Sequence, residues 1–463
     1  MTLLGRFSWF LVPSFAQIVT SSISIPMATL WLGPADYGAY ALTVAFSSLA
    51  SGISSLGSSF IFAQKHASSS PNVDMAQTVS THVLLSLTMS TACAYIMVNF
   101  WSDLGLFVPN LSSIPQRDVD LAALSILPTT MWSLAADLLT LNGRARFFAA
   151  VVIAQAIVST AALLSALIWF TQDAHALFIA NAVGSLVLGA GATSELWRYR
   201  AKPDFSQFKN GAITGGAAIS LSNIFDALYT VFERNLLLGF SGLASVGLYS
   251  HAQQYGGLVA VAVKALARAI WPVTLAEFKE SQLKFRRTRH HWNIAYFAIG
   301  MVGIFFATIG SELIGFITHG KFSSAGPFAT ACIACLLVQN MGKPVTAAMY
   351  STGRAVAFAK YVTLIGLVRL LVVVVAVPLC GAWGALVALL AYHVVFRIAM
   401  RLIVTDKVKL PYQDQWALTE FLLVAVIMGI IVIFSIEFRL KILILLAVGL
   451  TNSFLFIRLN KKY

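Results

Sequence analysis

Five basic side chains fall inside long apolar stretches of the second half of the sequence, where cations could hold an anionic ligand. They are Arg234, Lys264, Arg268, Lys343 and Arg369. In hydrocarbon each would cost ~2.5–3.5 kcal/mol, so we expect these side chains to face a protein interior or an aqueous cavity. For any of them near the end of an apolar stretch, snorkelling to the interface is the alternative.

Two helix faces carry the main charges. Gln253, Lys264 and Arg268 recur at helical spacing and predict one polar, cationic face. Asp226 and Glu233 lie seven residues apart and predict an acidic face on the preceding helix. We interpret Lys264 and Arg268 as an anion site, with an internal ion pair to Asp226 or Glu233 as the alternative. The two acids are candidates for coupling to proton or sodium movement.

The elements that position these residues must be transmembrane helices. The chain is 58% hydrophobic and 11% charged, whereas a soluble domain carries roughly 25% charged residues. Its apolar blocks are long enough to cross a ~30 Å hydrocarbon core as helices. The net charge of +13 lies mainly in short loops, which is typical of membrane orientation signals and does not indicate nucleic-acid binding.

The sequence consists of long apolar stretches separated by Gly, Pro and charged residues. This pattern predicts an all-α integral membrane protein with about fourteen transmembrane helices. The predicted spans are 7–32, 37–63, 77–100, 119–141, 147–170, 177–197, 211–239, 244–275, 292–318, 326–351, 356–379, 382–404, 416–436 and 440–459.

The basic residues fix a predicted orientation. With the N-terminus in the cytoplasm, the outside receives only Arg117, Lys321, Arg439 and Lys441, and nearly all other loop cations lie inside. We therefore expect a multi-pass protein with both termini in the cytoplasm.

A short internal repeat predicts two copies of a six-helix unit. Gly38-Ala-Tyr40 reappears as Gly247-Leu-Tyr249, at an offset of 209 residues (38 to 247), and Asn142-Gly-Arg144 has a counterpart in Thr352-Gly-Arg354. Copies with an even number of spans share one orientation, as in transporters with parallel repeats related by a pseudo-two-fold axis. We predict an N-terminal lobe 1–197, a cytoplasmic linker 198–210, a C-terminal lobe 211–405, and two extra helices with a tail at 406–463.

The same offset compares the charges of the two copies. Gln17 corresponds to Asp226 and Ser24 to Glu233, so the first copy keeps a polar pattern without the charges. We expect Gln17 and the serines near it to line the facing wall of one polar cavity. The serines could equally serve close helix packing.

Three other candidate motifs do not indicate a further functional site. Cys332 and Cys335 lie within an apolar span, where small packing residues are the favoured interpretation over a redox or zinc site. Asp118-Val-Asp120 resembles a metal and sugar-nucleotide element, but we interpret it as a solvated loop. The sequence lacks a Gly-x-x-x-x-Gly-Lys-Ser/Thr loop, so ATP hydrolysis by that route is excluded. We predict neither metal nor cofactor.

Three short segments resemble a known family: Leu32-Gly-Pro-Ala-Asp-Tyr-Gly-Ala-Tyr40, Glu233-Arg-Asn-Leu-Leu-Leu-Gly239 followed by Val246-Gly-Leu-Tyr-Ser250, and Trp271-Pro272. They look like Wzx-type polysaccharide flippases of the multidrug/oligosaccharidyl-lipid/polysaccharide (MOP) exporter superfamily. The likeness extends over the whole chain in length and span spacing. Where the family commonly has Asp in the second motif, this sequence has Glu233, which leaves the role of that acid open.

The resemblance implies two six-helix lobes around a central cavity and alternating access. It further implies flipping of an undecaprenyl-diphosphate-linked oligosaccharide from the cytoplasmic to the outer leaflet of the cell inner membrane, for lipopolysaccharide O-antigen or exopolysaccharide synthesis. The basic residues above would hold the diphosphate, and Gln17 and Gln253 would bind sugar. The last two helices would form a groove for the lipid tail, or simply add stability. Polysaccharide polymerase machinery is a further expected partner.

Two rival classes remain open. A multidrug or organic-cation exporter of the same superfamily would favour acids in its cavity, which the basic excess argues against. A membrane enzyme, such as a polymerase or ligase acting on lipid-linked sugars, usually needs a sizeable external loop, and the predicted spans leave no room for one. We therefore predict a transporter and not an enzyme.

Overall fold

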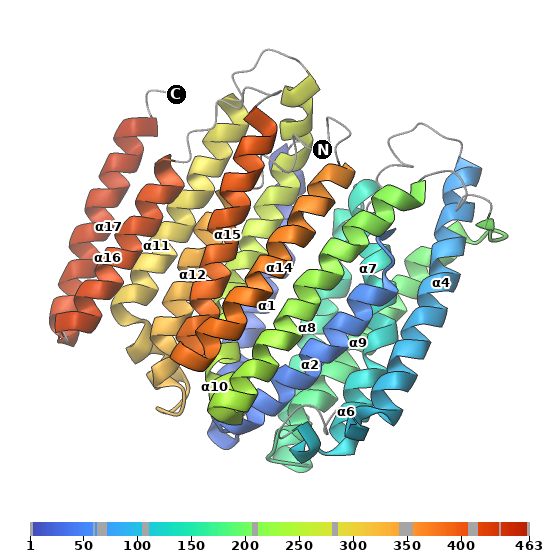
Figure 1. Ribbon diagram of the computed structural model, residues 1–463, viewed down its shortest axis with the longest axis horizontal. Helices are drawn as coiled ribbons and strands as arrows, with labels where there is room; N and C mark the ends of the chain where they lie inside the picture. Colours follow the sequence, from blue (N-terminus) through green and yellow to red (C-terminus); the bar gives the residue numbers. More distant parts are fainter. Residues whose placement is uncertain are drawn as a thin grey trace. The chain divides into compact units, whose positions relative to one another are not determined.

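The computed structural model describes residues 3–58, 61–62, 72–103, 111–205, 212–279, 286–341, 355–405, 415–434 and 437–460, and within these ranges all regular structure is helical (Figure 1). Nine helices in these ranges are long and apolar enough to cross a membrane. A shorter apolar helix spans Ala417–Ile431. The all-α membrane class predicted from the sequence is confirmed.

The helices follow the predicted spans closely, usually to within a few residues at each end. In chain order the α-helices are α1 (Leu3–Trp31), α2 (Pro34–Ser54), α4 (Asn72–Asn99), α6 (Gln116–Leu124), α7 (Ile126–Leu141), α8 (Ala145–Trp169), α9 (His175–Leu196), α10 (Ala212–Lys279), α11 (Arg286–Ile317), α12 (Gly326–Met341), α14 (Ala355–Cys380), α15 (Ala382–Thr405), α16 (Gln415–Phe434) and α17 (Phe438–Asn460). Short 3-10 turns lie at Leu111–Ser113, Trp197–Tyr199 and Ser323–Ala325.

Two local breaks interrupt predicted spans and a third falls between two of them, each at residues that disfavour helix. The second span was predicted to 63, but α2 ends at Ser54, before a turn in which Leu56 and Gly57 have φ of 49° and 68°. The fourth span divides into α6 and α7 because Pro128 has no N–H and its ring crowds the carbonyl four residues earlier. In α10, Gly242 has φ 76° and ψ 172°, which separates the seventh and eighth predicted spans.

The chain forms two compact units. Unit 1 comprises Met1–Gly247 with Ala355–Leu370, and unit 2 comprises Leu248–Arg354 with Leu371–Tyr463. We describe each unit by itself. The predicted lobes and linker divide the chain differently, and their boundaries stay predictions.

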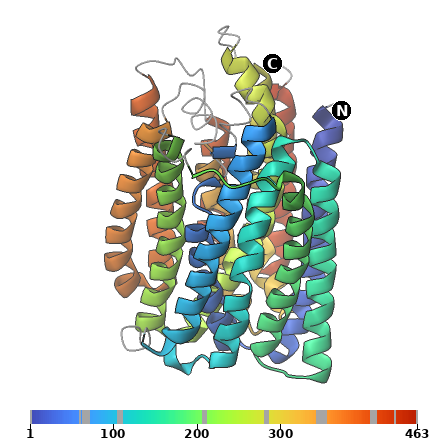
Figure 2. The same cartoon turned by 90° about the vertical axis from the view of Figure 1, so that its right-hand side faces the viewer.

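In unit 1 the helices pack along two apolar seams. α1, α8 and α9 share a cluster of small and branched side chains that includes Ala28, Leu163 and Ala176. α4, α7 and α9 share a second cluster around Leu134 and Leu138. Figure 2 shows α4, α7, α8 and α9 side by side. Small residues allow the helices of the first seam to approach closely, and larger side chains fill the second.

The repeated glycines of the sequence pack against each other within unit 1. A Cβ on Gly38 would overlap the carbonyl of Leu243, and a Cβ on Gly247 would overlap the carbonyl of Pro34. The Cβ position of each glycine also lies 3.0–3.1 Å from the backbone nitrogen of the other. The Gly-x-Tyr motif therefore marks a backbone contact between the start of α2 and the part of α10 after Gly242.

In unit 2, α11 is the helix against which the last two helices pack. Val424 and Ile427 of α16 and Ile444 and Leu445 of α17 join Ile304 of α11 in one apolar cluster. Phe297 stacks on Phe456, with ring centroids 4.3 Å apart. Lys441 Nζ lies 2.5 Å from Glu312 Oε1.

All four cysteines are free thiols, and the pair in α12 is buried. Cys332 lies against Gly256, whose Cβ would be 3.1 Å from the cysteine Cβ. The packing interpretation of Cys332 and Cys335 is confirmed.

The interpretation of Asp118-Val-Asp120 as a solvated loop is wrong. α6 begins at Gln116, so Asp118 lies in its first turn, 3% exposed, with its Oδ1 2.5 Å from His175 Nδ1. Asp120 is exposed and accepts a hydrogen bond from Gln116 at 3.0 Å. Two positions apart on a helix, the acids point in different directions, which does not suit shared metal binding.

We expect Gly38→Ala to destabilise the protein by about 1–3 kcal/mol or more, because a new methyl group would force backbone atoms of α2 and α10 apart. Thermal unfolding of the purified protein in detergent measures the effect. Gly239→Ala is the matched control, since no atom outside its own helix neighbourhood lies within 4 Å of a Cβ placed there. Equal melting temperatures for the two variants would contradict the close contact.

Asp173, between α8 and α9, should give a pH-dependent contribution to stability. Partial burial alone would raise the pKa of Asp173, but hydrogen bonds from Thr171 and the His175 N–H, with the charge of Arg117, outweigh burial and lower this pKa. A depressed folded-state pKa contributes stability above the unfolded pKa, and this is lost as pH falls through the folded pKa. We expect Asp173→Asn to lower the melting temperature more at pH 7 than near pH 3.

Thermal unfolding at the two pH values tests this expectation. Asp103→Asn, which removes an exposed acid after α4, is the control. A melting-temperature difference between wild type and Asp173→Asn that is the same at both pH values would contradict it.

Candidate functional site: a buried ion cluster in unit 1

A buried arginine is the centre of the candidate site. Arg369 lies on α14, in the part of that helix that belongs to unit 1, and is 9% exposed. Its helix is apolar over most of its length, so an ionised guanidinium there needs partners from the protein.

The partners come from one face of α10. Arg369 Nη2 lies 3.6 Å from Glu233 Oε2, and Arg369 Nη1 lies 3.9 Å from Asp226 Oδ1. Between these acids, the ring of Tyr229 lies beneath the guanidinium, with Cζ 3.0 Å from the ring centroid. Residues 226, 229 and 233 are spaced by three and four, which places them along one helix face. The acidic face predicted from the sequence thus meets a cation of α14.

The two acids differ in their surroundings. The side chain of Glu233 is 3% exposed, whereas that of Asp226 is 58% exposed. Arg369 therefore holds a buried carboxylate on one side and a more accessible one on the other. The Arg369–Glu233 pair matters more for stability, because removing one member of a buried ion pair leaves the other charge unpaired and costs several kcal/mol.

A second arginine adjoins this cluster. Arg234 follows Glu233 on α10, and its Nη1 donates a hydrogen bond of 2.5 Å to the carbonyl oxygen of Ala41 on α2. Ala41 follows the Gly38-Ala-Tyr40 motif by one residue. The guanidinium thus ties α10 to α2, the helix that contains the repeated glycine Gly38. Counting Arg369, Arg234, Asp226 and Glu233, the group carries two formal positive and two formal negative charges.

The other predicted site residues are more widely distributed. Gln17 is half-buried on α1 in unit 1, and Gln253 is half-buried on α10 in unit 2. Lys264, also on α10 in unit 2, has an exposed side chain. The side chain of Arg268 and the whole of Lys343 lie outside the described residues. The structure thus brings together Asp226, Glu233 and Arg369, with Arg234 next to Glu233 in the sequence, and the cavity assignment of the full set stays a prediction.

The sequence interpretation missed the partnership of Arg369 with the acids. Its alternative to an anion site at Lys264 and Arg268 was an ion pair of these residues with Asp226 or Glu233, and it did not consider Arg369, which the structure shows in contact with both acids. Helical spacing identifies residues on one face of one helix and says nothing about the helix opposite. The available signal was that Arg369 is a lone cation deep in an apolar span.

A second buried polar pair lies in unit 2 and was not singled out from the sequence. Glu420 of α16 is 0% exposed, and both of its carboxyl oxygens accept hydrogen bonds from Asn452 Nδ2 of α17, at 3.0 and 2.9 Å. Gly300 of α11 leaves room for the Glu420 side chain, since a Cβ at position 300 would lie 2.9 Å from the Cβ of Glu420. This contact fastens α16 to α17 against α11. An acid in a predicted span was the signal that could have found it.

Comparison with solved structures identifies the fold class. The fold is similar to that of an inward-facing multidrug resistance MATE family transporter of the MOP superfamily, with TM-score 0.64 and 15% identity over 88% of this chain and 99% of that one. It is similar to lipid II flippase MurJ in an inward closed conformation, with TM-score 0.67 and 14% identity over 97% of this chain and 98% of that one.

A MOP superfamily transporter from Pyrococcus furiosus, described as having a binding pocket of reverse polarity, gives TM-score 0.64 and 14% identity over 88% of this chain and 97% of that one. The chain therefore has the fold of a MOP-type membrane transporter.

The family follows from the sequence itself. Residues 27–326 match the family described as "Polysaccharide biosynthesis protein", and the chain belongs to that family. The search of curated proteins gave no match. The resemblance to MOP-superfamily polysaccharide flippases is confirmed by this family and by the fold.

We expect Glu233→Gln to destabilise the protein by roughly 3–5 kcal/mol, because it removes the carboxylate closest to a buried guanidinium. Asp226→Asn should cost less, since that side chain is largely exposed. Adding Arg369→Gln to Glu233→Gln should recover part of the loss, because both buried charges are then gone and only the exposed Asp226 remains ionised. Thermal unfolding of the single and double variants forms a double-mutant cycle. Strict additivity of the two single effects would contradict a direct Arg369–Glu233 interaction.

Proposed function

We propose that this protein flips an undecaprenyl-diphosphate-linked oligosaccharide from the cytoplasmic to the outer leaflet of the inner membrane by alternating access. The observation that carries the proposal is that a polysaccharide biosynthesis family match over residues 27–326 coincides with a fold similar to a lipid II flippase over 97% of the chain. The family argues for a saccharide substrate, and the fold argues for transport.

Physical chemistry requires a carrier for such a substrate. An oligosaccharide head group has many hydroxyls, and each would lose its hydrogen bonds to water in hydrocarbon at a cost of several kcal/mol. A protein path must replace those hydrogen bonds, while the polyprenyl tail can stay in the bilayer. The rivals, an organic-cation exporter or a membrane enzyme for lipid-linked sugars, are less well supported, because the family is one of polysaccharide biosynthesis and the similar folds belong to transporters.

The diphosphate site that we propose centres on Lys264 and Arg268, one helical turn apart on α10, with Lys343 as an additional cation and Gln17 and Gln253 as sugar ligands. Ammonium and guanidinium groups make strong charge-assisted hydrogen bonds to phosphate oxygens. Arg234 and Arg369 belong to the same proposed path.

Arg369 gives the path a means of ion coupling. It already contacts Glu233 and Asp226, so a diphosphate that approaches it competes with two carboxylates for one guanidinium. A carboxylate that loses its cation in a membrane interior holds a proton more strongly. Substrate binding at Arg369 would then favour protonation, or sodium binding, at Asp226 or Glu233.

The remaining predictions complete the proposal. The termini and the segment 198–210 lie in the cytoplasm, the two six-helix lobes alternate in access, and α16 and α17 form a surface for the lipid tail. Polysaccharide polymerase machinery would use the flipped product. The pathway to which that product belongs, O-antigen or another polysaccharide, is set by the glycosyltransferases that supply the substrate.

A flipping assay tests the function. The purified protein in liposomes should move a short fluorescent polyprenyl-diphosphate oligosaccharide between leaflets, measured as the fraction that an impermeant quencher reaches. Lys264→Gln and Arg268→Gln should each slow flipping by roughly tenfold, the loss of one charge-assisted contact. Lys264→Arg keeps the charge and is the matched control. If both Gln variants flip at the wild-type rate, the diphosphate site is elsewhere, and if wild type moves no substrate the proposed function fails.

The same liposomes with an imposed proton or sodium gradient address coupling. A gradient should speed wild type, and Asp226→Asn or Glu233→Gln should lose that response. A wild type indifferent to both gradients would leave the two acids with a structural role.

A further inference from the structure

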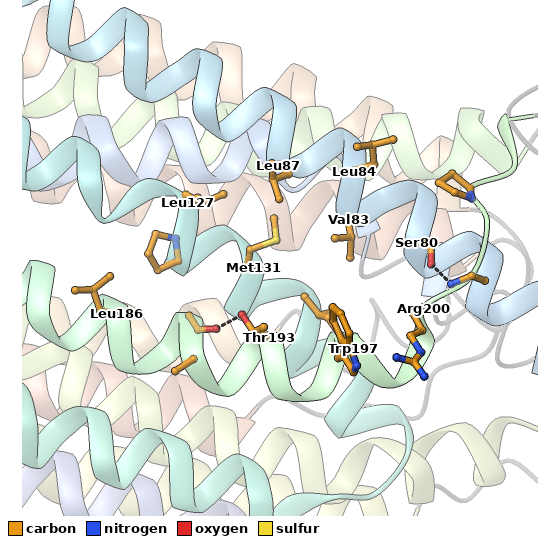
Figure 3. Close-up of a pocket in the computed structure, with 16 residues that line it drawn as sticks. Ser80, Val83, Leu84, Leu87, Leu127, Met131, Leu186, Thr193, Trp197 and Arg200 are labelled. Atoms are coloured by element: carbon orange, nitrogen blue, oxygen red, sulfur yellow. Dashed lines mark hydrogen bonds between the residues drawn. The ribbon is translucent and has the colours of Figure 1, made fainter.

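A groove in unit 1 lies apart from the ion cluster. It has a volume of about 600 Å³ and is bounded by α4, α7, α9 and the segment that follows α9 (Figure 3). Every residue that lines it belongs to unit 1.

The walls of the groove are almost entirely apolar. Leu87 of α4, Met131 of α7 and Leu186 of α9 are among the side chains that line it (Figure 3). Thr193 also lines the groove, but its hydroxyl donates to the carbonyl of Gly189 at 2.9 Å and so is already satisfied. Such a lining suits a hydrocarbon chain. It offers little to a sugar head group, whose hydroxyls would lose their hydrogen bonds.

One end of the groove is cationic. Arg200 is the charged side chain among the 16 lining residues, and its guanidinium lies 5.4 Å from the ring centroid of Trp197. The exposed Arg198 and Lys202 lie close by in sequence. Glu195, at the end of α9, is 2% exposed and pairs with Arg144 and Arg198. The segment 198–204 holds three cations and one acid, Asp204, so the balance of charge at this end favours an anion.

The cationic end is held by hydrogen bonds. Ser80 Oγ donates to the carbonyl of Tyr199 at 2.8 Å and accepts from the N–H of Ala201 at 2.9 Å. Thr81 makes the equivalent pair with Asp204, accepting from its N–H at 2.9 Å and donating to its carbonyl at 3.4 Å. Two adjacent hydroxyls of α4 thus fix the chain on both sides of Arg200. These contacts place the arginine at the mouth of the groove.

The length of the groove matches one leaflet. Leu186 and Arg200 are 14 positions apart, which corresponds to roughly 20 Å along the chain axis at helical rise. Half of a ~30 Å hydrocarbon core plus its interface is about the same depth. A chain anchored at Arg200 would therefore extend from the interface towards the middle of the bilayer.

We propose that this groove binds one acyl chain of an anionic glycerophospholipid, with the lipid phosphate at Arg200. Arg200 lies in the predicted cytoplasmic linker 198–210, so the lipid belongs to the leaflet on that side. The end of the groove that would hold the lipid head group is formed by the linker, which is hydrogen-bonded to α4. Bound lipid would therefore stabilise the attachment of the linker to α4. The residues that line the groove include none of those in the proposed transport path.

Retention of lipid by the purified protein tests the proposal. The full-length protein is equilibrated in neutral detergent with equimolar dioleoylphosphatidylglycerol and dioleoylphosphatidylcholine, and bound lipid is counted by native mass spectrometry. Wild type should retain phosphatidylglycerol in preference to phosphatidylcholine. Arg200→Gln should reduce phosphatidylglycerol retention about fivefold, as expected for one basic residue at ~1 kcal/mol, and Arg200→Lys should restore most of it.

Two further variants separate the groove from general surface charge. Ala190→Trp fills the groove from α9 at an exposed position that lines it, and should remove phosphatidylglycerol retention. Arg198→Gln removes a neighbouring charge outside the lining residues and should reduce retention clearly less than Arg200→Gln does. Thermal unfolding confirms that each variant is folded.

The proposal is overturned by any of three results. Equal losses in Arg198→Gln and Arg200→Gln would indicate diffuse attraction to the protein surface. Full retention in Ala190→Trp would place the lipid elsewhere. Displacement of phosphatidylglycerol by undecaprenyl phosphate in wild type would assign the groove to the polyprenyl carrier. None of these results depends on the flipping assay, so the lipid site and the proposed function can fail separately.

Discussion

The hydrocarbon surroundings impose one demand that shapes the whole molecule, namely that every polar group in a membrane helix must find a partner within the protein. The contact of Arg369 with Glu233, at 3.6 Å, meets that demand for one cation and one acid at once. In doing so it fastens the first part of α14 to the first part of α10. Backbone groups satisfy the same demand by helix formation, which explains why the described regular structure is all helical.

Helix positions could be predicted from the sequence because span length and hydropathy are local properties. The start of α15 at Ala382 and the break of α10 at Gly242 both follow from apolar length and glycine. Partners across helices could not be predicted, since no local pattern relates residue 369 to residues 226 and 233. The error at Asp118 has a similar origin. α6 starts three residues before the predicted span, and this shift turns a loop acid into a helical one that faces His175.

The two copies suggested by the repeat use different polar chemistry on corresponding helices. α1 packs on α8 in the first copy, and the corresponding helices of the second copy, α10 and α14, meet where Phe225 lies 4.0 Å from the Cβ position of Gly366. At the offset of 209, Gln17 occupies the place of Asp226. The polar residues of α1 satisfy themselves locally, as Thr20 does by donating to the carbonyl of Ala16 at 2.9 Å. Helix pairing therefore needs no ion pair in the first copy, whereas in the second copy the contact of Arg369 with Glu233 joins the paired helices.

Charge balance explains how the charges of the second copy could be used. Arg369, Arg234, Asp226 and Glu233 sum to zero formal charge, so the group is acceptable in a membrane without substrate. A diphosphate added to it would leave the site strongly negative unless a cation accompanied it. Asp226 has an exposed side chain, whereas Glu233 is buried against Arg369. In the proposed coupling, a proton or sodium ion would therefore reach Asp226 first, and Glu233 would keep Arg369 paired while the substrate passes.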